Sequence, residues 1–190
     1  MPLHIHPSSA SELASELAAF VHLLKDAVDH GASLGFFPPL DLGTVRGYWL
    51  SLRDELRQGT RVLLVARAAD GRIVGTGQIA LPTLPSSRHR AEVQKLLVDS
   101  RDRGGGIGRR LMEALHEEAL ARGRTLIVLG TRFGERPEGF YRRLGYREAG
   151  VIPGYTIDAA GRRFDRTNFY LDLGAAVTRS PLPGEVETTA

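Results

Sequence analysis

The chain has 190 residues, a length that suits one domain with a full hydrophobic core and is short for two. Its hydrophobic share of 42% and charged share of 25% exclude a fibrous or wholly disordered chain. No apolar run approaches the ~20 residues of a membrane helix, and the N-terminus lacks the pattern of a secretory signal. With no cysteine, the sequence excludes disulfides and a cysteine nucleophile, and a cytoplasmic location is the default expectation.

The basic residues are almost all arginine. The net charge is only +3, but 23 of the 25 basic residues are arginine, and the pI is about 9.6. Codon bias can account for this composition, whereas the functional interpretation is an anionic ligand, because the planar arginine fork suits phosphate. Eleven arginines fall between positions 101 and 147, around a glycine-rich loop. Aromatic residues amount to 7% and are scattered, so no nucleic-acid-binding face is expected.

The first half of the chain changes from a helical to a strand period. Apolar residues at spacings of three and four predict an amphipathic helix with Ser11 as its N-cap and Gly31 as its stop. Short β-branched runs on both sides of a hairpin signal at 69–72 predict the first strands of a meander. The expected elements are a helix over 11–30, a loop over 31–40, a helix over 44–57, and strands over 61–67, 72–81 and 90–98.

The second half of the chain alternates helices and strands after a glycine-rich loop. The apolar run over 125–129 is typical of a strand buried on both faces, and with the preceding strand and helix it predicts a right-handed βαβ crossover. The expected elements are a helix over 107–122, a strand over 125–129, a helix over 137–144, and strands over 145–152 and 163–173. This order predicts a single mixed α/β domain over 1–173 with a central sheet, followed by a flexible tail over 174–190.

The glycine-rich loop, Arg103-Gly104-Gly105-Gly106-Ile107-Gly108, lies between a predicted strand and a predicted helix. Unpaired N–H groups and the helix dipole at such a position favour an anion, and glycines let a phosphate approach the backbone. The alternative is a plain flexible turn that starts a helix. No Gly-Lys-Ser/Thr follows, which excludes a P-loop, and the preceding meander fits a dinucleotide fingerprint poorly.

The surroundings of this loop resemble a known family. The segment RAEVQKLLVDSRDRGGGIGRRLMEAL resembles the acyl-CoA-binding motif of the GNAT superfamily of N-acetyltransferases, whose Arg/Gln-x-x-Gly-x-Gly/Ala pattern falls on Arg103, Gly106 and Gly108. FYRRLGYRE, at 140–148, is similar to the second motif of that family. HGASLGF, RAEVQKL and PGY together resemble the tabtoxin-resistance acetyltransferase group. The resemblance implies an α/β GNAT fold, a mixed central sheet with splayed parallel strands flanked by helices.

The resemblance also implies acetyl-CoA as acyl donor and a set of residues that hold it. Pantetheine would bond to the backbone of a bulged strand, and the pyrophosphate would lie on N–H groups of the glycine-rich loop beside an arginine. The implied cofactor-binding residues are Leu96, Leu97, Val98, Arg103, Gly104, Gly105, Gly106, Ile107, Gly108, Arg109, Phe140 and Arg143.

Two residues are the candidates for acid–base catalysis. Tyr141 matches the family tyrosine whose hydroxyl reaches the departing thiolate, as a general acid; the alternative is that it only packs its short helix on the sheet. Glu92 is the candidate general base, on a strand among apolar neighbours where burial would disfavour the charged carboxylate. The alternative for Glu92 is a strand glutamate paired with a nearby arginine such as Arg90.

The acceptor side departs from the related group, which tends to carry an aspartate in a Leu-Asp-Thr context where this chain has Gly130. A second carboxylate is therefore missing, unless Glu135 substitutes for it, so the chemistry of the group carries over and its β-lactam substrate does not. The candidate substrate residues are His30, Ser33, Phe36, Phe37, Thr131, Glu135 and Tyr155. The loop at 31–40 is either a substrate lid or a packed Ω-loop. The isolated histidines predict no metal site.

The leading hypothesis is acetyl transfer to an amine, or hydroxyl, of a small molecule by direct attack in a ternary complex, because no cysteine can carry an acyl-enzyme. Transfer to a protein N-terminus or lysine is the main rival, and a closed lid would argue against it. A non-catalytic acyl-CoA sensor is the alternative from another class. A monomer or homodimer is expected, with no nucleic-acid or membrane partner.

Overall fold

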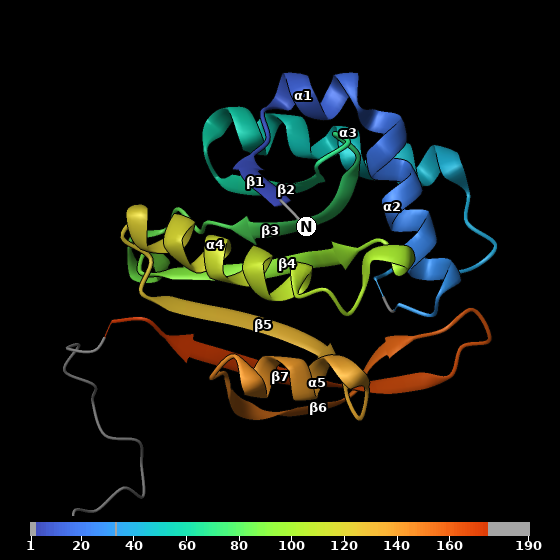
Figure 1. Cartoon of the computed structure of the whole chain (residues 1–190). Coiled ribbons are helices and arrows are strands. Elements are labelled where there is room, and N and C mark those ends of the chain that lie inside the picture. Colours follow the sequence, from blue (N-terminus) through green and yellow to red (C-terminus); the bar gives the residue numbers. More distant parts are fainter. Residues whose placement is uncertain (1–2, 33, 175–190) are drawn as a thin grey trace, which may run out of the picture.

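The computed structural model describes residues 3–32 and 34–174, which form a seven-stranded mixed sheet with helices on both faces (Figure 1). The strand order is β1-β2-β3-β4-β5-β7-β6. The strands are β1 (Leu3–Pro7), β2 (Arg61–Ala68), β3 (Ile73–Ala80), β4 (Arg90–Val98), β5 (Leu126–Arg132), β6 (Arg147–Ile157) and β7 (Arg163–Asp172). The α-helices are α1 (Ala10–Ser15), α2 (Leu17–Asp29), α3 (Leu42–Gln58), α4 (Ile107–Ala121) and α5 (Arg136–Arg143).

The predicted elements are present, and four details of the prediction are wrong. A strand precedes the first helix, because the short segment β1 pairs antiparallel with the edge of β2. The single helix expected over 11–30 is divided at Glu16 into α1 and α2. Its N-cap is Ser9 and not Ser11, since the Ser9 hydroxyl accepts the Glu12 N–H. The strand expected over 145–152 runs on to Ile157, past two irregularities in its pairing with β7.

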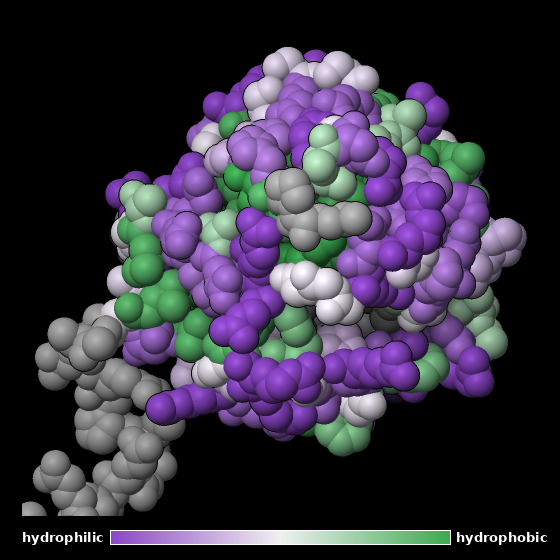
Figure 2. Space-filling model, in the orientation of Figure 1, coloured by the Kyte–Doolittle hydropathy of each residue, from purple (hydrophilic) through white to green (hydrophobic). Residues whose placement is uncertain are grey.

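Two apolar layers enclose the sheet. On one face, α1, α2 and α3 bury a cluster that includes Phe20, Trp49 and Leu63. On the other face, Leu111 and other residues of α4 pack on β2, β3 and β4, as Figure 1 shows for the helix crossing these strands. Among the described residues, no helix has the length and hydropathy needed to cross a membrane. Hydrophilic residues cover most of the side seen in Figure 2, where hydrophobic residues form separate patches.

The sheet is split between its two parallel strands. β4 and β5 pair only from Arg90↔Leu126 to Glu92↔Val128, although both strands continue further. In β4, Lys95 has a φ of 47°, and the register against β3 shifts from Gln78↔Gln94 to Thr76↔Leu97. Two residues of β4 therefore lie opposite one residue of β3, which is a β-bulge. The predicted fold class, a mixed sheet with splayed parallel strands, is confirmed.

Two glycines of β3 let α4 approach the sheet closely. A Cβ on Gly75 would lie 2.9 Å from the Leu97 carbonyl oxygen and 3.0 Å from Leu111 Cδ1. A Cβ on Gly77 would lie 2.8 Å from Leu115 Cδ1. A flexible leucine can turn away from such a contact, whereas a sheet carbonyl cannot, so Gly75 is the more constrained of the two positions.

We predict that Gly75→Ala destabilises the protein by about 1–3 kcal/mol, because the new methyl group overpacks the interface between β3, β4 and α4. The matched control is Gly47→Ala on α3, where a Cβ meets no atom within 4 Å. Replacing a helical glycine by alanine there should stabilise the protein by roughly 0.5–1 kcal/mol. Urea unfolding of both variants measures the difference, and equal midpoints would contradict the packing argument.

Candidate active site

The helix α4 begins without a side-chain cap. Its N-cap is Gly106, which has a φ of 81°, and no side chain bonds to the first N–H groups of the helix within the described part of the chain. Gly104 also has a positive φ, of 84°, and a Cβ at either glycine would point into open space. By contrast, the Asp41 carboxylate caps α3 by accepting two backbone N–H groups. The start of α4 thus keeps its donors and its dipole free for an anion.

The predicted cofactor-binding residues come together at this end of α4. The Arg103 Nε–H donates to the Val98 carbonyl oxygen at 3.1 Å, which joins the loop to the last residue of β4. Phe140 of α5 lies against the loop from the other side, 3.6 Å from the position of a Gly108 Cβ. Arg109 of α4 and Arg143 of α5 are both exposed. The divergent end of β4, the loop, α4 and α5 therefore surround one region.

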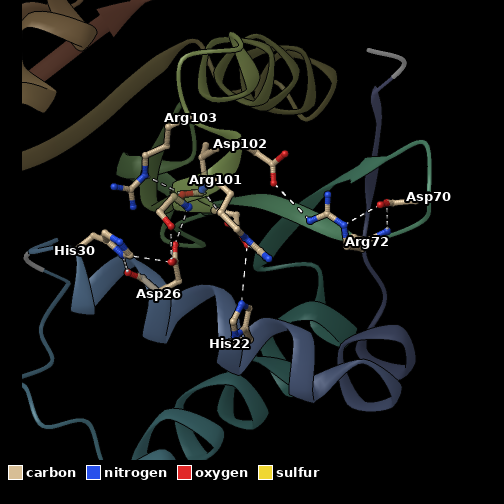
Figure 3. A network of polar contacts seen from close by, with 11 residues as sticks. His22, Asp26, His30, Asp70, Arg72, Arg101, Asp102 and Arg103 are labelled. Carbon is tan, nitrogen blue, oxygen red and sulfur yellow. Dashed lines mark hydrogen bonds and ion pairs between the residues drawn. The ribbon is translucent and has the colours of Figure 1, made fainter.

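An ion network fixes the loop from β4 to α4 onto α2 (Figure 3). The Asp26 carboxylate accepts the backbone N–H and the hydroxyl of Ser100, each at 2.7 Å. Asp99 is buried, and its carboxylate accepts the Arg101 side-chain and backbone N–H groups. The Arg101 guanidinium holds the pKa of Asp99 at about 2. His30, a predicted substrate residue, lies in this network, with Nδ1 2.8 Å from the Asp26 carbonyl oxygen.

Tyr141 lies in an aromatic cluster beneath this region. Its ring packs against Phe140, Tyr146 and Phe169, and only 9% of the residue is exposed. Burial raises the pKa of Tyr141 to about 12. The hydroxyl therefore keeps its proton at neutral pH and can serve as a donor. The packing role and the acid role expected from the sequence are compatible in this geometry.

Glu92 is less buried than its apolar neighbours suggest. Ala91 and Val93 point into the core beneath α4, whereas the side chain of Glu92 points to the other face and is 39% exposed. The expectation of a buried Glu92 is wrong because neighbouring side chains of a strand alternate between faces. Its charge partner is Arg166 of β7, whose Nη2 lies 3.7 Å from Oε1, and not the predicted Arg90.

The face that carries Glu92 is open along β5 as well. The strand was expected to be buried on both faces, but only Ile127 and Leu129 are buried, and the alternate residues are partly exposed. Thr131, a predicted substrate residue, is on the same face of β5 as Ile127 and Leu129. It therefore lies on the other face of the sheet from Glu92. Glu135 pairs with Arg132 at 3.3 Å. Tyr155 of β6 is exposed, and its hydroxyl accepts the Nη1–H of Arg166 at 2.6 Å.

The loop between α2 and α3 is attached to the same face of the sheet by Lys95. Its ammonium donates to the Leu34 carbonyl oxygen at 2.7 Å and lies 5.5 Å from the centre of the Tyr48 ring. Burial lowers the pKa of Lys95. Phe36 packs edge-on against Tyr48, while Phe37 is exposed. Ser33 lies outside the described residues.

Several residues of this face escape the sequence-based prediction. Tyr48, whose hydroxyl lies 3.0 Å from Gln78 Nε2, has the spacing of an ordinary core residue of α3. Lys95 points to the loop only because the bulge turns it there. Arg166 lies on the last strand of the chain, whose place between β5 and β6 no local pattern reveals. In the described residues, no group of three or more His, Asp or Glu side chains could hold a metal ion.

Comparison with known proteins agrees with the geometry. The family model of the acetyltransferase (GNAT) domain matches residues 59–148. The L-methionine sulfoximine/L-methionine sulfone acetyltransferase of Pseudomonas aeruginosa is 30% identical over 161 residues, 84% of this chain and 86% of that protein. The IAA acetyltransferase of Azospirillum brasilense is 36% identical over 110 residues, 57% of this chain and 69% of that protein.

Solved structures share the architecture. The yncA structure from Salmonella typhimurium with its cofactor acetyl-CoA matches with a TM-score of 0.71 at 18% identity, covering 96% of this chain and 100% of that one. The ribosomal-protein-alanine N-acetyltransferase of Brucella melitensis matches with a TM-score of 0.70 at 27% identity, covering 90% and 99%. The chain belongs to the GNAT family, and it is an N-acetyltransferase.

We predict that Asp99→Asn lowers the free energy of unfolding at pH 7 by on the order of 1 kcal/mol, because the charged bonds to Arg101 are lost. The folded pKa, about 2, lies below the ordinary value of 3.8. The contribution of the carboxylate is therefore full above about pH 4 and disappears as the pH falls towards 2. Denaturant unfolding from pH 7 to pH 2 should show the two proteins converging, and a constant difference would contradict the assignment.

Proposed function

We propose that this protein transfers the acetyl group of acetyl-CoA to the amine of a small, amino-acid-like molecule. The observation that carries the proposal is the split between β4 and β5, which opens after Glu92 and lies beside the uncapped start of α4. We assign the base to Glu92 and the acid to Tyr141. A thioester held in the split would have an acid on one side and a base on the other.

The residues present fit acetyl-CoA as the donor. The backbone of Leu96, Leu97 and Val98 diverges from β5 and offers groups to pantetheine on that side. The N–H groups over 104–109 suit the pyrophosphate, because two glycines of the loop leave space that a Cβ would fill. Arg103 supplies a full positive charge at its edge. Acetyl-CoA brings the acetyl group as an activated thioester, and the protein supplies position, a base and an acid.

The chemistry then requires three proton transfers. Glu92 accepts a proton from the ammonium of the acceptor, directly or through water, and frees the nitrogen lone pair. A bond forms between this nitrogen and the acetyl carbon while the carbon–sulfur bond breaks. Tyr141 donates its hydroxyl proton to the sulfur that leaves. The nitrogen, now bonded to the acetyl carbon, gives up its second proton through water to the Tyr141 phenolate, which leaves a neutral amide and restores the acid. Direct attack in a ternary complex is favoured because the chain has no cysteine to carry the acyl group.

The attached loop favours a small acceptor over a protein one. Lys95 holds the loop between α2 and α3 close to the sheet beside Glu92, and the aromatic contact of Phe36 with Tyr48 adds to this closure. Such a cover suits a molecule of amino-acid size and leaves little room for an extended peptide. The relatives that act on methionine sulfoximine and methionine sulfone point to acceptors of the same size.

We predict that saturating acetyl-CoA raises the melting temperature and that Arg103→Glu abolishes much of the rise. At about 100 times its dissociation constant, a ligand adds about 2.7 kcal/mol, or roughly 5–11 °C for a chain of this length. Arg46→Glu, at an exposed position of α3, is the matched charge reversal and should leave the rise intact. No shift of the wild-type protein at millimolar acetyl-CoA would overturn the proposal.

We predict that Glu92→Gln and Tyr141→Phe each reduce kcat by roughly 100-fold or more, the usual contribution of a general base or acid. Both variants should keep the melting shift with acetyl-CoA, because neither removes a cofactor contact. Glu117→Gln, at an exposed position of α4, is the control and should retain full activity. A non-catalytic sensor would show no turnover, and all three variants would have the melting shift of the wild-type protein with acetyl-CoA.

A further inference from the structure

The guanidinium of Arg166 occupies the space that a side chain at position 130 would fill. A Cβ built on Gly130 would lie 1.8 Å from Arg166 Nε and 2.5 Å from Cζ and Nη2. No side chain fits at position 130 unless the arginine moves.

The arginine is held in place but is not fully bonded. Its Nη1–H donates to the Tyr155 hydroxyl at 2.6 Å, and the guanidinium lies 4.5 Å from the centre of the Tyr155 ring. Nη2 lies 3.7 Å from Glu92 Oε1, which is too long for a hydrogen bond. Nε is buried and has no hydrogen-bond partner in the part of the chain that the structure describes. Nε faces the backbone of Gly130, so Nη2 is the nitrogen that a ligand can reach.

Nη2 carries the N–H groups of the guanidinium that are neither closest to Gly130 nor bonded to Tyr155, and an arginine N–H binds a carboxylate through a charge-assisted hydrogen bond. The neighbouring arginine, Arg132, is already engaged, because it stacks on Phe164 and pairs with Glu135. Lys95 is engaged with the loop through the Leu34 carbonyl. Arg166 is thus the cation that lies beside the candidate base, and its Nη2 makes no hydrogen bond to the described residues.

Glu92 and Arg166 together present a negative and a positive group side by side. An α-amino acid carries an ammonium and a carboxylate on one carbon, so it can bind both groups at once. We propose that Arg166, given its place by Gly130 and held by Tyr155, binds the carboxylate of the acceptor and makes α-amino acids the substrate class. This inference rests on the proposed function, since the ammonium must then lie at Glu92.

The test uses pairs of acceptors that differ only in the carboxylate. Purified protein is assayed for CoA release with L-α-amino acids, L-methionine sulfone and L-methionine sulfoximine, each beside its primary carboxamide. The wild-type protein should prefer the carboxylates. Arg166→Ala should lower kcat/KM for the best amino acid by roughly 10- to 100-fold and change the value for its carboxamide little, because a charged hydrogen-bonded pair is lost only with the former.

Gly130→Ala provides an independent test, since it leaves Arg166 in the sequence and removes it from its place. The loss should equal that of Arg166→Ala, and the double variant should lose no more than either single one. Gly47→Ala is the matched control and should keep the wild-type preference. All variants should keep the melting shift with acetyl-CoA, which shows that the fold and the donor site are intact.

Two kinds of result would overturn the inference while leaving the proposed function in place. One is a wild-type protein that binds acetyl-CoA but acetylates only acceptors without a carboxylate, or none of the amino acids. The other is an Arg166→Ala variant that loses activity equally on carboxylate and carboxamide, as expected of a merely structural residue. Failure of the wild-type protein to bind acetyl-CoA would instead overturn the proposed function itself.

Discussion

The site depends on the backbone conformation of one residue, Lys95. A φ of 47° is unfavourable for a residue other than glycine and costs on the order of 1 kcal/mol. In return, the bulge at this residue bends β4 away from β5, so that the β4 residues after Glu92 are not paired with β5. It also turns the ammonium towards the Leu34 carbonyl and the ring of Tyr48, contacts that offset the strain. One irregular residue thus opens the donor side and attaches the loop over the acceptor side.

The segments of the proposed donor half could be recognised in the sequence because their signals are local. The loop Arg103–Gly108 and the start of α4 are adjacent in the chain. The positive φ angles of the loop fall on Gly104 and Gly106, so each can be recognised from its own residue type. Phe140 and Tyr141 were found through a second short motif on one helix. The fold class followed for the same reason, since the alternation of strand and helix around the crossover is visible in the periodicity.

The acceptor half could not be predicted, because it is assembled from distant strands. Gly130, Tyr155 and Arg166 lie on β5, β6 and β7, whose spatial order differs from their order in the chain. The burial of Glu92 was misjudged for a related reason: its sequence neighbours face the core, and only the register of the sheet tells which face the carboxylate takes. Strand β1 was missed because its alternation, Leu3-His4-Ile5-His6, is only four residues long and ends at a proline.

This division has a consequence for how acceptor preference can change in such a fold. The proposed donor half offers mainly backbone groups, so it depends on the path of the chain and on few particular side chains. The acceptor half is made of side chains on an open sheet face, where an exchange at one position requires space at another. Gly130 and Arg166 show such an exchange, because the cation can lie over β5 only where the strand has no side chain. A change at both positions would alter the charge on this face and leave the bulge, the loop and Tyr141 where they are.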